Sequence, residues 1–208
     1  MARWLTNYLL LSSFAFGLCC CSTTSKTKVV SAIEQCPVAY KQRINTATYN
    51  TTIDFYGKHL SGLLLFKAVG DTAKRVVFLS ETGFKFFDFE FGAGGFAVKY
   101  CIPGLNKPVV VNTFKKDFGL LLNEQKESGL AQIEKDSAIT ITFAGEKNKR
   151  SYYTVDKQCK NLQKIEMGEG GLKSLSIGIK GMKNGNFDKV EIIHHNLNLR
   201  ISLTQIDK

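Results

Sequence analysis

Residues 75–91 read RVVFLSETGFKFFDFEF, a pattern typical of an antiparallel hairpin. Its second half alternates three phenylalanines with two acidic residues: Phe87, Phe89, Phe91, Asp88 and Glu90. A period of two places one apolar and one polar face on an extended strand, so we expect both carboxylates on a solvated outer face. Residues 80–83, SETG, have the composition of a turn. Phe84 and Phe86 are out of phase with the later phenylalanines, which predicts a β-bulge near Phe86.

The two-residue period continues on both sides of this hairpin. It recurs in segments 49–55, 60–69, 74–80, 96–100, 138–143, 151–155, 175–179, 189–193 and 197–206. From Pro108 to Leu122 the apolar residues instead follow helical spacing, and proline is favourable at the first helical position. The sequence therefore predicts a mainly β (α+β) domain of roughly nine to eleven antiparallel strands with one amphipathic helix. Because a single flat sheet of that width is unusual, the sheet must curl on itself or form two packed sheets.

The composition supports one folded domain. The chain has 208 residues, of which 44% are hydrophobic and 22% charged, and only three prolines, which excludes a disordered tail. Its formal net charge of +10 attracts phosphates of nucleic acid or of lipid headgroups. Binding of single-stranded nucleic acid would require aromatic residues interleaved with lysine and arginine, whereas here the aromatics alternate mainly with acidic or neutral residues. We therefore expect no nucleic-acid partner.

The N-terminus has the features of an export signal. Arg3 precedes an apolar run over residues 4–18, which is shorter than the roughly 20 residues of a membrane-spanning helix, so cleavage is expected. Residues 18–22, LCCCS, resemble the lipobox of bacterial lipoproteins, and Cys21 fits the position of the acylated cysteine. The alternative is a plain secretory peptide with three adjacent cysteines. The lipobox interpretation makes residues 1–20 the signal peptide, 21–28 a tether and 29–208 one domain, with residues 29–43 forming a short broken helix or two turns.

The order of these elements resembles the LolA/LolB-like envelope lipoproteins, especially LolB-like domains of uncharacterised role. The resemblance rests on residues 75–91, the glycine turn after them, the strand at 96–100, the Pro103-Gly104 loop and the helix. The segment 189–201, KVEIIHHNLNLRI, looks like the closing hairpin of the same group. The resemblance implies a half-open barrel with a helical lid, which holds acyl chains or lipoprotein cargo. It also implies a lipid-anchored protein of the bacterial outer membrane that faces the periplasm and has an envelope transport partner.

Ten residues on the apolar faces are candidates for binding acyl chains. They are Phe55, Leu64, Phe66, Phe78, Phe87, Phe89, Phe96, Val98, Phe114 and Phe118. The same residues could instead fill a solid core, which would favour a lipid-anchored structural or assembly subunit without a ligand. Lipoprotein-inserting members of the resembled group carry an apolar side chain on a protruding loop, whereas residues 80–83 are polar here. We therefore predict binding of acyl chains without predicting their insertion into a membrane.

The sequence contains no recognisable catalytic or metal-binding motif. His194 and His195 fall in a predicted solvated turn and lack the further ligands of a zinc site. No nucleophile motif or phosphate loop is present, so we expect neither an enzyme nor a cofactor. Three scattered cysteines remain after the signal region and allow at most one disulfide. The resemblance places the two helical segments together, which implies a bridge between Cys36 and Cys101.

Overall fold

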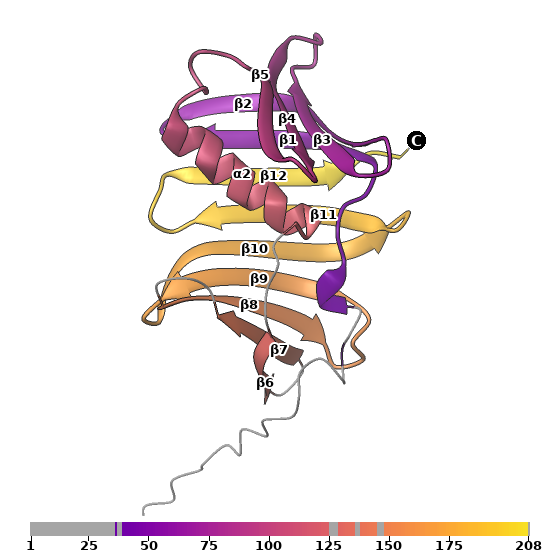
Figure 1. Ribbon diagram of the computed structural model, residues 1–208, viewed down its shortest axis with the longest axis vertical. Helices are drawn as coiled ribbons and strands as arrows, with labels where there is room; N and C mark the ends of the chain where they lie inside the picture. The colour runs from indigo at the N-terminus through magenta and orange to yellow at the C-terminus, as the bar shows by residue number, and fades with distance from the viewer. Residues whose placement is uncertain (1–35, 37–38, 125–128, 136–137, 145–147, 208) are drawn as a thin grey trace, which may run out of the picture.

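The computed structural model describes residues 36, 39–124, 129–135, 138–144 and 148–207 (Figure 1). Residues 1–28, which include Cys21, the predicted signal peptide and the tether, lie outside the described residues. The described elements are η1 (Ala39–Lys41), β1 (Ala47–Phe55), β2 (Lys58–Val69), β3 (Ala73–Leu79), β4 (Lys85–Gly92), β5 (Gly95–Cys101), α2 (Pro108–Leu122), β6 (Gly129–Lys135), β7 (Ala138–Ala144), β8 (Lys149–Asp156), β9 (Leu162–Glu169), β10 (Leu172–Lys183), β11 (Asn186–His194) and β12 (Leu199–Gln205).

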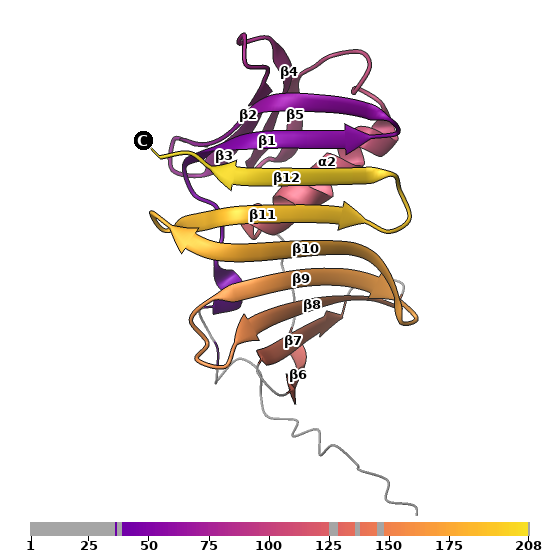
Figure 2. The same cartoon turned by 180° about the vertical axis from the view of Figure 1, so that it is seen from behind.

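The described strands form one antiparallel sheet. Their order is β5-β4-β3-β2-β1-β12-β11-β10-β9-β8-β7-β6, so every two adjacent strands are also consecutive in the chain except β1 and β12. Among these strands, β5 and β6 end the sheet and do not pair with each other, which leaves the barrel open. The sheet curves around α2 on its inner side (Figure 1), and Figure 2 shows β1, β12, β11 and β10 across the outer side with α2 behind them.

This architecture confirms the fold class predicted from the sequence. The helix has the predicted bounds, Pro108 to Leu122. The predicted bulge is also present, because Phe78 pairs with Phe87 while Leu79 pairs with Lys85, which leaves Phe86 as the extra residue. The described part of the chain contains twelve strands, one more than the predicted range, since β6 and β9 were not predicted. Gly170 and Gly171 form the turn between β9 and β10.

Helix α2 packs one face onto the aromatic side chains of the sheet. Pro108 is at the start of the helix, where its missing N–H needs no partner. Asn123 ends the helix in the left-handed conformation, and its backbone N–H donates to the carbonyl of Leu120. The buried face includes Val110, Phe114, Phe118 and Leu121. None of the described helices is long and apolar enough to cross a membrane.

The predicted Cys36–Cys101 disulfide is wrong, because the structure pairs Cys36 with Cys159. Their Cα atoms are 5.0 Å apart although 123 residues separate them in the chain. The segment after Cys36 lies against the β8–β9 turn, where the side chain of Gln42 accepts a hydrogen bond from the Leu162 N–H at 2.8 Å. It also reaches the end of α2, through a hydrogen bond from the Ile44 N–H to the Leu121 carbonyl. Cys101 is a partly buried free thiol.

Candidate functional site

The space directly beneath α2 is filled by side chains. Seven of the ten candidate residues lie there, and each is at most 1% exposed: Leu64, Phe66, Phe78, Phe87, Phe89, Phe114 and Phe118. The Phe87 ring lies 4.5 Å from that of Phe89 and 5.3 Å from that of Phe114 between centroids. Phe118 extends the cluster to Phe66, 6.2 Å away. These rings form a close-packed core that fixes α2 on the sheet.

The other three candidates lie at the margin of this core. Phe55 and Phe96 are partly buried and pack against it. Val98 pairs with the inward-facing Phe89 in the β4–β5 ladder but is 40% exposed. Because β5 is an edge strand, Val98 has a neighbouring strand on one side only. The structure therefore does not place Val98 in the buried cluster.

A cavity of about 910 Å³ lies beside α2, at the rim of the barrel. We call it the lateral cavity. One flank of α2 forms its upper wall, and the β9–β10 hairpin and the β11–β12 connection form its lower wall. Its lining residues are Asn112, Thr113, Lys116, Lys149, Met167, Gly168, Glu169, Leu172, Lys173, Ser174, Leu175, His194, Asn196 and Leu197.

Sequence reasoning missed the lateral cavity entirely, because none of the ten candidates lines it. Met167 and Leu175 point inward at alternating positions of β9 and β10, but β9 was not predicted as a strand. Gly168 and Glu169 end this strand, and only Gly170 and Gly171 form the turn to β10. A period-two count through residues 164–168, where Ile165 and Met167 alternate with polar residues and glycine, would have indicated this strand and, with it, the hairpin that forms the lower wall.

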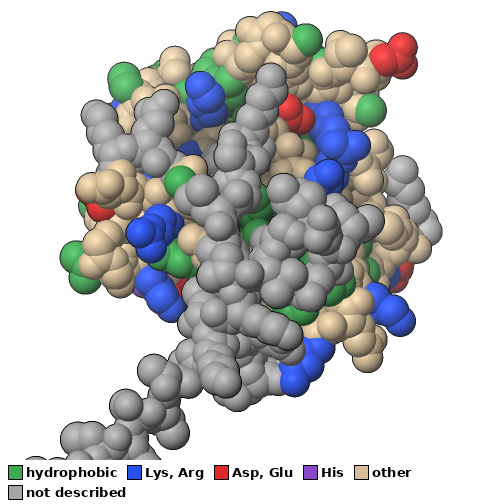
Figure 3. Space-filling view, turned by 60° about the horizontal axis from the view of Figure 1, so that its bottom comes forward, with side chains coloured by type: hydrophobic (Ala, Val, Ile, Leu, Met, Phe, Trp, Pro, Cys, Tyr) green, Lys and Arg blue, Asp and Glu red, His purple; other side chains and the backbone are tan. Residues whose placement is uncertain are grey.

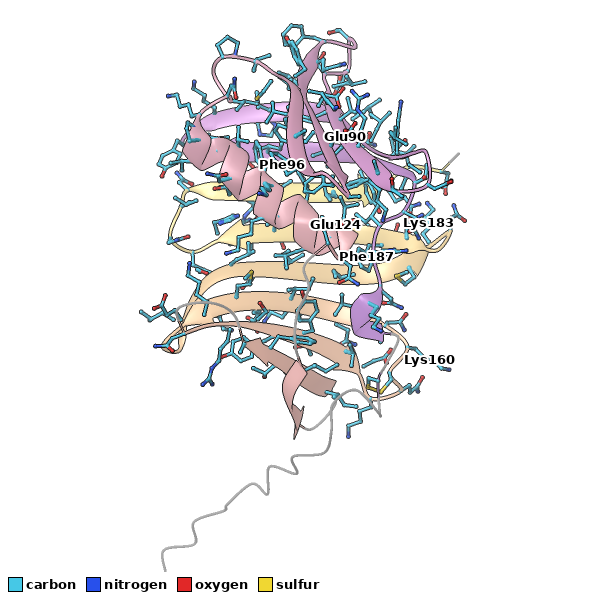
Figure 4. All side chains as sticks on the ribbon, in the orientation of Figure 1. Glu90, Phe96, Glu124, Lys160, Lys183 and Phe187 are labelled. Atoms are coloured by element: carbon cyan, nitrogen blue, oxygen red, sulfur yellow. A yellow bond between two sulfur atoms is a disulfide. The ribbon has the colours of Figure 1, made fainter. Side chains whose placement is uncertain are left out.

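Two smaller cavities also border α2. One, of about 570 Å³, lies at the start of the helix and is mainly apolar, with Phe55, Leu60 and Val110 in its lining and the exposed side chains of Tyr56 and Val109 at its margin. The other, of about 370 Å³, lies between β4–β5 and α2 and includes Phe96, Lys115 and Glu124 in its lining. Figure 4 shows Phe96 and Glu124 beside the helix.

A buried acid–histidine pair ties α2 to the sheet next to the lateral cavity. Nε2 of His194, at the end of β11, lies 2.9 and 3.1 Å from the two carboxylate oxygens of Asp117. Burial raises the pKa of Asp117, while the hydrogen bond to His194 and the charges of His194 and Lys116 oppose that rise. The predicted solvated turn is therefore wrong for His194, because the helix covers this position. His195 is exposed and lies 2.9 Å from the Ser176 hydroxyl.

The acidic pair of the β4 hairpin also differs from its prediction. Asp88 is 1% exposed, because Arg75 on β3 and Lys85 on β4 cover its carboxylate. The Arg75 Nε donates to it at 2.8 Å and Lys85 Nζ at 3.2 Å. Burial alone would raise the pKa of Asp88, but these hydrogen bonds and charges outweigh it and lower the pKa. The expected solvated position is wrong for Asp88, whereas Glu90 is partly exposed and pairs with Lys99.

Basic side chains are prominent on one face of the molecule. Figure 3 shows more lysine and arginine than aspartate and glutamate on the side that it brings forward. In the lateral cavity, burial and the nearby charge of Lys149 lower the pKa of Lys116, and Asp117 opposes that shift. In the part of the chain that the structure describes, no group of three or more histidine, cysteine or acidic residues is placed to hold a metal ion. The arrangement offers an apolar surface next to fixed positive charge.

Comparisons with known proteins agree with this geometry at the level of the fold. No family model matches the sequence, and no curated protein matches it. Among solved structures, the crystal structure of LolA superfamily protein NE2245 from Nitrosomonas europaea is similar, with a TM-score of 0.56 and 11% sequence identity. The fold is LolA-like. The alignment covers 86% of this chain and 93% of the LolA superfamily protein, so the LolA-like fold extends over nearly the whole domain.

Proposed function

We propose that the protein is a lipid-binding carrier or chaperone of the bacterial envelope, which holds the acyl chain of a lipid or lipoprotein in the lateral cavity. The LolA-like open barrel supports this class of function, and no catalytic activity is proposed. The proposal includes acylation of Cys21 as a membrane anchor in the outer membrane, on the periplasmic side, and an envelope transport partner. The sequence of the export signal supports the anchor.

The lateral cavity is the observation that carries the proposal. Its volume of about 910 Å³ lies near the upper end of the range of about 300–1,000 Å³ for small-molecule sites. Met167, Leu175 and Leu197 contribute apolar surface on the side of the sheet. Each methylene transferred from water to such a surface contributes about 0.8 kcal/mol, so eight methylenes contribute about 6 kcal/mol before the cost of association.

The ten residues predicted from the sequence form the second part of the proposed site. Seven of them fill the space beneath α2, so an acyl chain in the lateral cavity reaches them only when α2 moves away from the sheet. Such a movement would have to break the contact between Asp117 and His194. Without such a movement, the proposed chain would lie beside the helix.

Binding of a fluorescent fatty acid tests the proposal. We expect the wild-type protein to bind the probe and Leu197→Asn, which places an amide on the cavity wall, to bind at least about tenfold more weakly. Val69→Asn is the control, because Val69 is an exposed aliphatic residue that belongs to neither part of the proposed site. A wild-type protein that binds no acyl probe and retains no lipid on purification would contradict the proposal.

Acylation is tested separately, by metabolic labelling with a fatty acid in a bacterial host. We expect label in the wild-type chain and none in Cys21→Ser. Cys20→Ser is the control, because the lipobox register assigns the acylated position to the third cysteine. Label retained in Cys21→Ser would show that the register is wrong.

The dense aromatic packing beneath α2 supports one alternative, a lipid-anchored structural or assembly subunit with a filled core. This alternative predicts no acyl binding by the wild-type protein. The fatty-acid titration therefore separates the two functions.

A further inference from the structure

We propose that the lateral cavity selects an anionic single-chain amphiphile, whose carboxylate or phosphate headgroup binds between Lys116 and Lys149. This inference rests on the proposed lipid-binding function and assigns the class of ligand. It concerns the one part of the cavity wall where a partly buried positive charge lies next to an apolar surface.

Lys116 lies on the flank of α2 that faces the lateral cavity, and its side chain is partly buried. The neighbouring Asp117 is engaged by His194, and its charge only partly opposes the fall in the pKa of Lys116 that burial and Lys149 cause. Within the described residues, no carboxylate lies within ion-pair distance of the Lys116 ammonium. A charge withdrawn from water without a counter-ion is unfavourable, so an anion entering the cavity would relieve that cost.

The other charged groups of the lining strengthen this preference. Lys149, at the start of β8, lies close enough to Lys116 to lower its pKa, so two positive charges face the same space. Lys173 is already paired, since its Nζ lies 2.7 Å from a carboxylate oxygen of Glu166. Glu169 is the acidic residue in the lining; it is exposed at the end of β9, opposite Lys149 in the β8–β9 ladder. The lysines of the lining outnumber this carboxylate, so the net charge of the wall is positive.

The apolar part of the lining indicates that the anion carries a hydrocarbon chain. Leu172, at the tip of the β9–β10 hairpin, is 79% exposed, although it belongs to the cavity wall. Met167, Leu175 and Leu197 continue this apolar surface towards the sheet. A bound chain would cover Leu172, while a lysine ammonium provides a point charge that suits either a carboxylate or a phosphate.

Competition with three sixteen-carbon probes tests the proposal. Palmitate and hexadecyl phosphate carry an anionic headgroup, and hexadecanol does not. We expect the wild-type protein to bind both anions about tenfold more tightly than the alcohol at low salt. The tighter of the two anions distinguishes a carboxylate ligand from a phosphate ligand.

Variants then locate the charge. Lys116→Met keeps the length of the side chain and removes its charge, and we expect it to bind all three probes with the affinity of the alcohol to within about threefold. Lys149→Met should lose part of the preference for the two anions over the alcohol. Lys115→Met is the matched control: Lys115 is the preceding residue on α2, its ammonium lies over the Phe96 ring at 5.4 Å, and it does not line the lateral cavity. Circular dichroism and melting temperature establish that each variant is folded.

The outcomes separate this inference from the function on which it rests. Equal affinity of the wild-type protein for all three probes would overturn the headgroup assignment and leave the proposed lipid binding intact. Binding of none of the probes would overturn both. A preference lost equally in Lys115→Met and Lys116→Met would show that net charge, and not the lateral cavity, attracts the anion.

Discussion

The two halves of the sheet are built from different side chains. In the half that comprises β2–β5, phenylalanine rings from strands and helix contact one another, with Phe87 at the centre of the cluster. The inner faces of β7–β10 instead carry mostly aliphatic side chains, among them Ile141, Ile165 and Ile177, and the pair Phe143–Tyr153 provides a ring contact there.

Helix α2 belongs mainly to the aromatic half. It crosses the inner side of the sheet and ends near β11 (Figure 1). Within the helix, Asp117 contacts His194 at the end of β11. The lateral cavity opens on the flank of the helix that faces the aliphatic half. A LolA-like barrel can therefore combine a wall filled by packed side chains with an accessible cavity at its rim. The number of aromatic residues in the sequence does not predict the size of the ligand site.

The largest change in stability is expected for a substitution that tests whether the aromatic half is a solid core. Phe114→Asn removes a ring that contacts Phe87, Phe89 and Phe118 and buries an amide in its place. We expect the free energy of unfolding to fall by about 3–5 kcal/mol, as measured by urea denaturation. Leu197→Asn, on the accessible rim, should destabilise the protein less and affect acyl binding more. The opposite order would show that the open site lies beneath α2.

The disulfide tests the connection of the N-terminal segment to the aliphatic half. Cys36→Ser opens a loop of 123 residues, and we expect a loss of about 2–4 kcal/mol in the free energy of unfolding. Cys101→Ser should change it little, because this thiol is free. Mass spectrometry of a non-reduced digest should find a peptide that joins Cys36 to Cys159, and a peptide that joins Cys101 to either of them would contradict the structure.

A smaller effect is expected on the outer face of the aromatic half, where Asp88 pairs with Arg75 and Lys85. Asp88→Asn should lower the free energy of unfolding by about 1–3 kcal/mol at pH 7, because it removes the charged acceptor of two hydrogen-bond donors. The pKa of Asp88 is lower in the folded protein than in the unfolded chain, where it is about 3.9. The contribution of Asp88 to the free energy of unfolding is therefore complete above that pH, and it is lost as the pH falls through the pKa of the folded protein.

Unfolding of the two proteins at several pH values checks this expectation. The difference in free energy of unfolding between wild type and Asp88→Asn should be constant from about pH 7 to pH 5 and should shrink at lower pH. Glu90→Gln is the control, since Glu90 is partly exposed and its ion pair with Lys99 is at the surface. A difference that grows on acidification would show that Asp88 is not ionised in the folded protein.

The local structure and, through the order of the elements, the fold class could be predicted from the sequence. The two-residue period identified most of the strands, the phase change among the phenylalanines located the bulge at Phe86, and the helical spacing after Pro108 set the bounds of α2. These features could be predicted because the backbone period alone decides which way neighbouring side chains point. The resemblance of residues 75–91 and 189–201 to LolA/LolB-like proteins agreed with the observed LolA-like fold.

The contacts between residues that are distant in the chain could be seen only in the tertiary structure. Asp117 and His194 are 77 residues apart in the chain, and Cys36 and Cys159 are 123 apart, so no local period brings either pair together. The burial of Asp88 depends on charges presented by both strands of a hairpin, and the lateral cavity depends on where α2 stops covering the sheet. The period could indicate that Phe87 and Phe114 point inward, but whether their rings meet or leave a cavity depends on how close the helix lies to the sheet, a distance set by the volumes of all the side chains between them.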